Sequence, residues 1–372
     1  MEILELQDRI NYTLDALNSA KSISKKRRYF AYLSGLVSIY NSITGSKVQI
    51  AEMDNQNIMK PTFYQSFIQE ISHTEGLLLG ISDGILKTRQ EVGCEFRPQF
   101  LARTYGRKYL SEILESFLAD LGDRFYRLYK EAETDGRLFY NQEFSGGITT
   151  FDYPMLKSFI FLPKDRETIP FLITTVHELG HAFDYDYTKC SRKAVNAVKF
   201  NVNIETFSMF LEILLIEYLK RIHFDPDEVK MIEEKICNDL IGHASEVNFG
   251  LSLSETFIDP DFKLVLRDLD DAARCYDEFL QKYGLEYIKG DINYENSVQY
   301  MYGGLIANIY AYYYGQDRNF INEICKHFLD YEAYSTEEIL ERLPFVKEEL
   351  NGFPILRKKL EQVKANQNWL AL

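Results

Sequence analysis

The chain has 372 residues, 46% of them hydrophobic, so it can bury a large core in one two-lobed unit or in two modest domains. Its 56 acidic and 42 basic residues give a net charge of −14, which argues against nucleic acid or an anionic membrane as a partner, because both require a basic surface. The first eight residues lack the basic start and apolar stretch of a signal peptide, and no apolar run reaches membrane-spanning length. We therefore expect a cytoplasmic protein.

Helical periodicity dominates the first third of the chain. It predicts helices over Leu4–Tyr40, Pro61–Gln90 and Tyr109–Glu133, followed by a turn at Asp135-Gly136. Strand signals are few, and they cluster between Phe144 and Leu162. We expect a mainly α-helical fold with a small β element, divided into an N-terminal helical region over residues 1–140 and a second region over residues 141–372.

The next predicted helix carries the pattern H-E-x-x-H. Thr168 and Pro170 favour a helix start, as cap and first-turn residue, and His177 and His181 follow well inside the helix. Residues four apart lie on one helix face, so both imidazoles can bind the same zinc ion, with Glu178 beside them as a general base. The neighbouring residues are apolar, and a buried carboxylate beside two histidines favours a bound cation over the alternative of two ordinary core histidines.

A second buried helix is predicted over Glu205–Leu219. Its polar residues Glu205, Ser208 and Glu212 share one face of an otherwise apolar segment. Glu205 as third ligand would complete a site of two histidines and one glutamate with an open position for water, which is typical of catalytic zinc. Glu212 would accept a hydrogen bond from a ligand histidine. The alternative is that these acidic residues form a buried salt bridge elsewhere.

Further helices are predicted towards the C-terminus, where Asp225-Pro226 is typical of a helix N-terminus and Gly352-Phe353-Pro354 predicts a break. Their expected ranges are Val229–Leu240, Lys263–Tyr283, Tyr294–Tyr314 and Thr336–Val363.

Three segments resemble the M3 oligopeptidases, the family that includes oligoendopeptidase F and thimet oligopeptidase. The family's motifs are H-E-x-G-H on one helix, E-x-x-S-x-x-x-E on a helix downstream, and an upstream glycine-rich turn followed by an apolar strand. The resemblance is specific over about residues 110 to 220. Here the motifs are His177–His181 with Gly180; Glu205, Ser208 and Glu212; and Ser145–Thr150 followed by Ser158–Pro163.

The resemblance implies a zincin-like helical metallopeptidase with a small β element beside the zinc cleft. It also implies that a strand aligns the substrate backbone, either in the Gly146–Thr150 region or over Phe159–Leu162. Main-chain pairing of this kind favours short, unfolded peptides over folded proteins. Residues 141–372 would then be the zinc-binding catalytic region.

Two departures from the family pattern concern the oxyanion site and the length. Family members carry a histidine before a tyrosine-rich helix near the C-terminus, and the corresponding stretch, residues 300–314, has none. We expect Tyr302 and Tyr310 to stabilise the oxyanion instead, with His243 as a remote substitute, although these tyrosines can equally line a core or a channel wall. The chain is shorter than typical members on its N-terminal side, which would leave a more open cleft.

The sequence therefore predicts a zinc metalloendopeptidase that hydrolyses internal bonds of short peptides. It would bind one Zn²⁺ through His177, His181 and Glu205, with Glu178 as general base. Two alternatives stay open. One is a protease dedicated to a single protein target, and the other is a non-catalytic zinc-containing protein that binds peptides.

Overall fold

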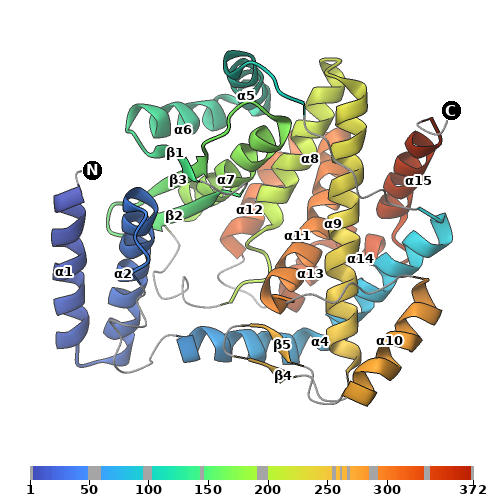
Figure 1. Cartoon of the computed structure of the whole chain (residues 1–372), viewed down its shortest axis with the longest axis horizontal. Coiled ribbons are helices and arrows are strands. Elements are labelled where there is room, and N and C mark those ends of the chain that lie inside the picture. The colour runs from blue at the N-terminus through green and yellow to red at the C-terminus, as the bar shows by residue number, and fades with distance from the viewer. Residues whose placement is uncertain are drawn as a thin grey trace. The chain divides into compact units, whose positions relative to one another are not determined.

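The computed structural model describes residues 3–48, 60–94, 103–142, 146–190, 200–253, 257–259, 262–265, 269–284, 292–330 and 336–369. The fold is mainly helical with a small three-stranded sheet (Figure 1). Two compact units divide it, and each combines two segments of chain. Unit 1 comprises residues 1–66 and 102–200, and unit 2 comprises residues 67–101 and 201–372. The boundary expected at residue 140 would divide the chain into two continuous segments. This boundary stays a prediction.

The sheet belongs to unit 1 and contains β1 (Leu138–Gln142), β2 (Ile148–Asp152) and β3 (Lys157–Pro163). The strand order is β1-β3-β2, with β1 parallel and β2 antiparallel to β3. Because β3 is paired on both sides, its backbone has no edge left for a substrate, and the expectation that Phe159–Leu162 align a peptide is wrong. In the described part of the sheet, β2 is an edge strand. β1 precedes the region in which strands were expected.

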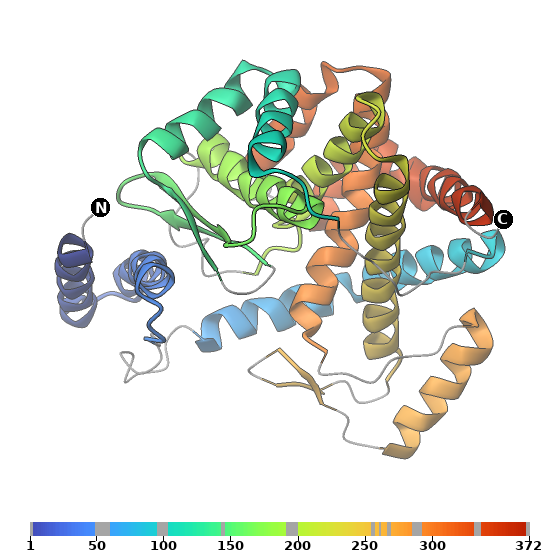
Figure 2. The ribbon, with the colours of Figure 1, turned by 45° about the horizontal axis from the view of Figure 1, so that its top comes forward.

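Helices cover both faces of this sheet, which follows from the alternation of side chains along its strands. Phe159 and Phe161 form one core cluster with residues of α1 (Ile3–Ser19) and α2 (Ile23–Thr44). On the other face, Phe151 of β2 stacks on Tyr185 of α7 (Ile169–Thr188), with ring centroids 4.9 Å apart. Figure 2 shows the sheet between the α1–α2 pair and α7. The helix that carries H-E-x-x-H is thereby fixed against a sheet.

Two of the helices expected near the N-terminus are each interrupted. The helix expected over Leu4–Tyr40 is α1 followed by α2, and Ser22 caps α2 by accepting a hydrogen bond from the Lys25 amide. The helix expected over Tyr109–Glu133 is α5 (Arg107–Leu121) followed by α6 (Asp123–Thr134). Gly122 separates them at φ 137°, a conformation that side chains disfavour.

Unit 2 is built around α11 (Tyr294–Gln316), which packs against α8 (Thr206–Arg221) and α9 (Pro226–Ser252). The helix expected from Lys263 begins only at Leu269, because Leu264–Val265 pair with Phe257–Ile258 as strands β5 and β4. The break at Gly352-Phe353-Pro354 is confirmed, and α12 was not expected. The remaining helices are α4 (Lys60–Val92, largely in unit 2), α10 (Leu269–Tyr283), α12 (Phe320–Asp330), α13 (Thr336–Arg342), α14 (Pro344–Leu350) and α15 (Pro354–Trp369).

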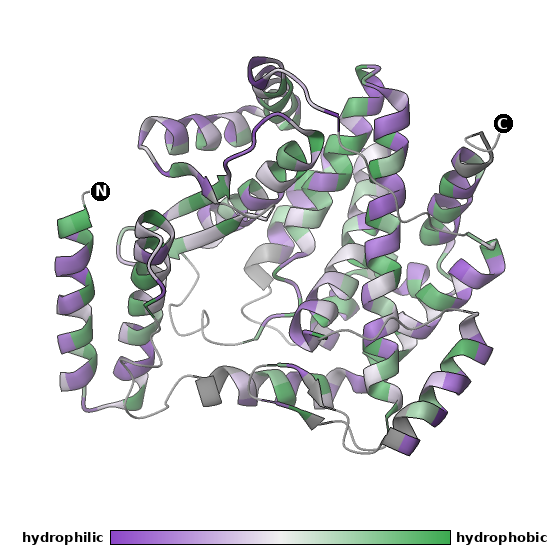
Figure 3. Cartoon of the chain, viewed as in Figure 1, coloured by the Kyte–Doolittle hydropathy of each residue, from purple (hydrophilic) through white to green (hydrophobic). Residues whose placement is uncertain are grey.

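The distribution of hydrophobic residues differs between α1 and α8. Along α1, hydrophobic and hydrophilic residues alternate at helical spacing, whereas α8 is hydrophobic around most of its circumference (Figure 3). A helix of the second kind is typical of a protein interior. Among the described helices, none is both long and apolar enough to cross a membrane.

Candidate metal centre

The start of α7 confirms the expected capping residues. Thr168 has extended backbone angles, its hydroxyl accepts a hydrogen bond from the Phe171 amide at 3.3 Å, and Pro170 lies in the first turn. The helix continues without interruption through His177 and His181, so both side chains lie on the same face. His177 and Glu178 are buried, and His181 is half-buried.

The two imidazoles are placed as a chelating pair. Nε2 of His177 and Nε2 of His181 lie 3.2 Å apart, and the two rings are inclined at 79°. Two nitrogen ligands of a tetrahedral zinc ion lie about 3.3 Å apart, given Zn–N bonds of about 2.0–2.1 Å. The observed spacing therefore fits zinc without a change of helix geometry.

Glu205 occupies the N-cap position of α8, directly before the first residue of the helix. Its carbonyl accepts from the Met209 amide at 3.0 Å, while the Thr206 amide bonds back to the Asn203 carbonyl. A Cβ atom on Gly303 of α11 would lie 3.2 Å from the Glu205 Cβ and 3.1 Å from the Thr206 nitrogen. The absence of a side chain at Gly303 thus lets α11 lie directly against the backbone that carries the carboxylate.

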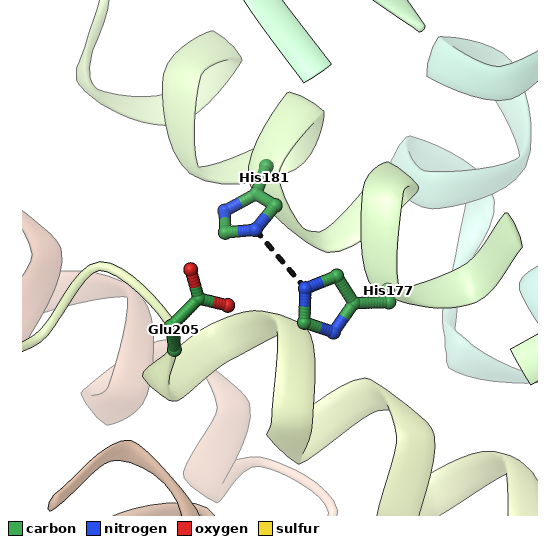
Figure 4. A group of neighbouring side chains, drawn as sticks. All are labelled: His177, His181 and Glu205. Carbon is green, nitrogen blue, oxygen red and sulfur yellow. Dashed lines mark hydrogen bonds between the residues drawn. The ribbon is translucent and has the colours of Figure 1, made fainter. Parts of the chain in front are cut away.

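Figure 4 shows His177, His181 and Glu205 turned towards one another. One ligand atom from each of the three residues lies within 4.8 Å of the others. Two imidazole nitrogens and a carboxylate oxygen are the donor set of catalytic zinc sites, which keep a fourth position open. The described residues that could hold a metal ion are therefore those expected from the sequence.

A second carboxyl group interacts electrostatically with Glu205. Burial and the carboxylate of Glu205 raise the pKa of Glu295, in the first turn of α11, to about 7. Glu295 therefore holds a proton more readily than an exposed glutamate does.

Both the side chain and the backbone carbonyl of Glu178 contact β2. The hydroxyl of Thr149 lies 2.7 Å from Glu178 Oε2 and 2.9 Å from the Glu178 carbonyl oxygen, and it can donate to either. A Cβ atom on Gly147 would lie 2.8 Å from Glu178 Oε1 and closer still to Cγ, so a side chain there would displace the Glu178 carboxylate. The position of the expected base therefore depends on the glycine-rich turn and the first residues of β2.

The expected oxyanion donors lie on α11. Tyr302 is fully buried, burial raises the pKa of its hydroxyl well above the usual range, and that hydroxyl has no hydrogen-bond partner among the described residues. Tyr310 is also fully buried, and its hydroxyl lies 3.3 Å from Nδ1 of His327 on α12. The Tyr310 ring packs edge-on against Phe210 and Phe345. The oxyanion role of both tyrosines stays a prediction.

The other polar candidates lie in unit 2. His243 of α9 stacks on Tyr300 with ring centroids 5.3 Å apart, and its Nδ1 lies 3.5 Å from a carboxylate oxygen of Glu246. Glu212 is half-buried on α8, and Ser208 is fully buried. Their roles stay predictions.

Sequence reasoning missed the contacts that position Glu178 and Glu205. The glycine-rich turn before β2 was noted as a substrate-binding feature, but nothing in its pattern indicates that Gly147 and Thr149 face Glu178. The Gly303-Gly304 pair within a predicted buried helix was the available signal for a close helix contact, because such a glycine usually has a packing reason.

No family model matches the sequence, and no curated protein matches it. The fold is similar to that of a protein from Chlamydophila abortus assigned as a peptidase, with a TM-score of 0.53 and 15% identity over 91% of this chain. It is also similar to a protein from Bacillus anthracis assigned as an oligoendopeptidase F, with a TM-score of 0.50 and 13% identity over 96% of this chain. This chain spans 62% of the length of the first and 69% of the second. At such identities the likeness concerns the fold alone.

Proposed function

We propose that this protein is a zinc-dependent endopeptidase that hydrolyses internal bonds of short peptides, in the manner of the M3 oligopeptidases. The observation that carries the proposal is the 3.2 Å spacing of the His177 and His181 nitrogens, with a Glu205 oxygen within 4.8 Å of the ligand atoms. Glu178, next to His177 in sequence, supports a hydrolytic role, because a protein that only binds peptides has no need of a base there. The fold similarity to two proteins assigned as peptidases adds support.

In this proposal the two histidines and Glu205 hold one zinc ion. When bound, zinc polarises the scissile carbonyl and makes water more acidic. Glu178 takes a proton from the attacking water and passes it to the leaving amine. Thr149 and Gly147 confine its carboxylate while it does so.

β2 is the strand that would align the substrate. It is an edge strand of the described sheet, and it begins directly after Gly146 and Gly147, beside Glu178. Ile148, its first residue, is 38% exposed. An extended peptide that pairs with this edge presents its backbone near the base, which favours short, unfolded substrates.

The test is cleavage of a quenched fluorescent peptide library by the purified protein. Glu178→Gln should reduce kcat by about 10²- to 10⁴-fold, the usual contribution of a general base, while bound zinc stays near one per chain. Glu112→Gln, at an exposed position of α5, is the matched control and should keep full activity. Chelator treatment should abolish cleavage, and added zinc should restore it.

Three results would count against the proposal. Unchanged activity in Glu178→Gln would remove the base from the mechanism, and full zinc occupancy in Glu205→Ala would remove the third ligand. Stoichiometric zinc without cleavage of any peptide would favour a peptide-binding protein or a protease restricted to one protein target.

A further inference from the structure

The side chain of Glu178 contacts the hydroxyl of Thr149, a group that takes no direct part in the proposed hydrolysis. Oγ1 of Thr149 lies between the Glu178 carbonyl oxygen, at 2.9 Å, and Oε2 of the same residue, at 2.7 Å. A hydroxyl has one proton to donate, so it bonds to one of these oxygens at a time or is shared between them. Either way it links the carboxylate of Glu178 to β2.

The other oxygen of the Glu178 carboxylate, Oε1, lies close to the backbone of Gly147. Oε1 of Glu178 lies against Gly147, where even a single Cβ atom would come within 2.8 Å of it. Glu178 is only 5% exposed. The carboxylate is thus bounded by a glycine backbone on one side and by a hydroxyl on the other.

We propose that Thr149 is a positioning residue, which holds the Glu178 carboxylate in the one orientation from which it accepts the proton of water. A glutamate side chain has three rotatable bonds, and a general base must lie within hydrogen-bond reach of the proton that it removes. Small displacements of a reacting group cost up to about 100-fold in rate. The inference rests on the proposed function, since it assigns a role within the same reaction.

Thr13 of α1 provides a matched control away from β2. Its side chain is buried, and its Oγ1 donates a hydrogen bond to the Arg9 carbonyl oxygen at 2.8 Å. Thr13→Val and Thr149→Val make the same chemical change, because each removes a donating hydroxyl and keeps the β-branched shape. Only Thr149→Val alters the surroundings of Glu178.

The experiment compares kcat, KM, bound zinc and thermal midpoint in the zinc-loaded protein and its variants. Thr149→Val should lower kcat by about 10- to 100-fold, with KM, zinc content and midpoint close to those of the parent. Thr149→Ser keeps the hydroxyl and should recover most of the lost kcat. Thr13→Val should keep the parental kcat.

A second readout does not depend on activity. In crystals of the zinc-free protein, Glu178 should adopt a single side-chain orientation in the parent and in Thr149→Ser, and more than one in Thr149→Val. The same single orientation in all three would overturn the inference. A parental kcat in Thr149→Val, an equal loss in Thr149→Ser, or an equal loss in Thr13→Val would overturn it as well.

Failure of the proposed function gives a different result. In that case the parent protein cleaves no peptide and Glu178→Gln changes nothing, while the orientation of Glu178 in the crystals still decides whether Thr149 positions it.

Discussion

Glu178 and Glu205, the two acidic residues of the candidate centre, are supported in different ways. Glu178 is held from a β-strand, through the hydroxyl of Thr149 and the bare backbone of Gly147. Glu205 begins a helix, its side chain forms no cap with that helix, and Gly303 of α11 lies against its backbone. A general base acts on the rate through its position relative to the attacking water, whereas a metal ligand acts on metal affinity through its position relative to the ion. The contrast therefore predicts that contacts to Glu178 govern turnover and contacts to Glu205 govern zinc affinity.

The largest expected effect concerns Glu205 itself. Glu205→Ala removes one of the three proposed ligands, so zinc affinity should fall by more than the roughly 10- to 100-fold that loss of an outer-shell partner costs. Glu217→Ala, at an exposed position of the same helix, should leave affinity unchanged. Competition with a chromogenic chelator measures both variants, and equal affinities would refute the assignment of Glu205.

Substitution at Gly303 tests whether helix packing places the ligand. Gly303→Ala puts a Cβ within 3.2 Å of Glu205 and should reduce zinc affinity by about tenfold and the unfolding free energy by about 1–3 kcal/mol. Gly315→Ala makes the same change at the other end of α11, where a Cβ meets nothing within 4 Å. It should leave zinc affinity unchanged and stabilise the helix slightly. Similar zinc affinities in the two variants would contradict the prediction that packing against Glu205 governs zinc affinity.

Gly147→Ala tests the other half of the comparison. The added methyl group displaces the Glu178 carboxylate, so kcat should fall by about tenfold while zinc stays bound. Gly106→Ala, at a position with φ −69° and open space around the Cβ, serves as the control. Steady-state kinetics with parallel zinc analysis separates the two effects, and loss of zinc in Gly147→Ala would contradict the proposed division of roles.

The smallest expected effect is a pH dependence of stability in unit 2. Burial would raise the pKa of Glu233, but Lys359 and Lys220 outweigh it and lower the pKa below the usual range. A lowered pKa in the folded state means that this stabilisation is present above about pH 4.5 and is lost as the pH falls through the folded-state value. Its size should be on the order of 1 kcal/mol.

Glu233→Gln should therefore flatten the dependence of unfolding free energy on pH in the acid range. Chemical denaturation between about pH 3 and pH 7 measures it. Glu361→Gln, at an exposed position of α15, should retain the parental slope. A parental slope in Glu233→Gln as well would show that another carboxyl group causes the acid sensitivity.

The errors of the sequence-based prediction lie where long-range pairing decides the structure. The helix expected from Lys263 fails because Leu264–Val265 pair with a separate segment, and no local pattern indicates that pairing. The central position of β3 could not be predicted either, because an apolar strand has the same sequence pattern whether one or both of its edges are paired. Breaks marked by glycine and proline, such as Gly352-Phe353-Pro354, were predictable because they act through local backbone geometry.

The sequence by itself determined the mainly helical fold and the histidine pair with Glu178 beside it. Helix geometry relates residues four apart in the chain, so the 3.2 Å spacing of His177 and His181 follows from local structure once the helix forms. The tertiary structure alone decided that Thr149 and Gly147 confine Glu178 and that Gly303 lies against Glu205. These contacts join segments that are distant in sequence, and only the packing of strand on helix and of helix on helix specifies them.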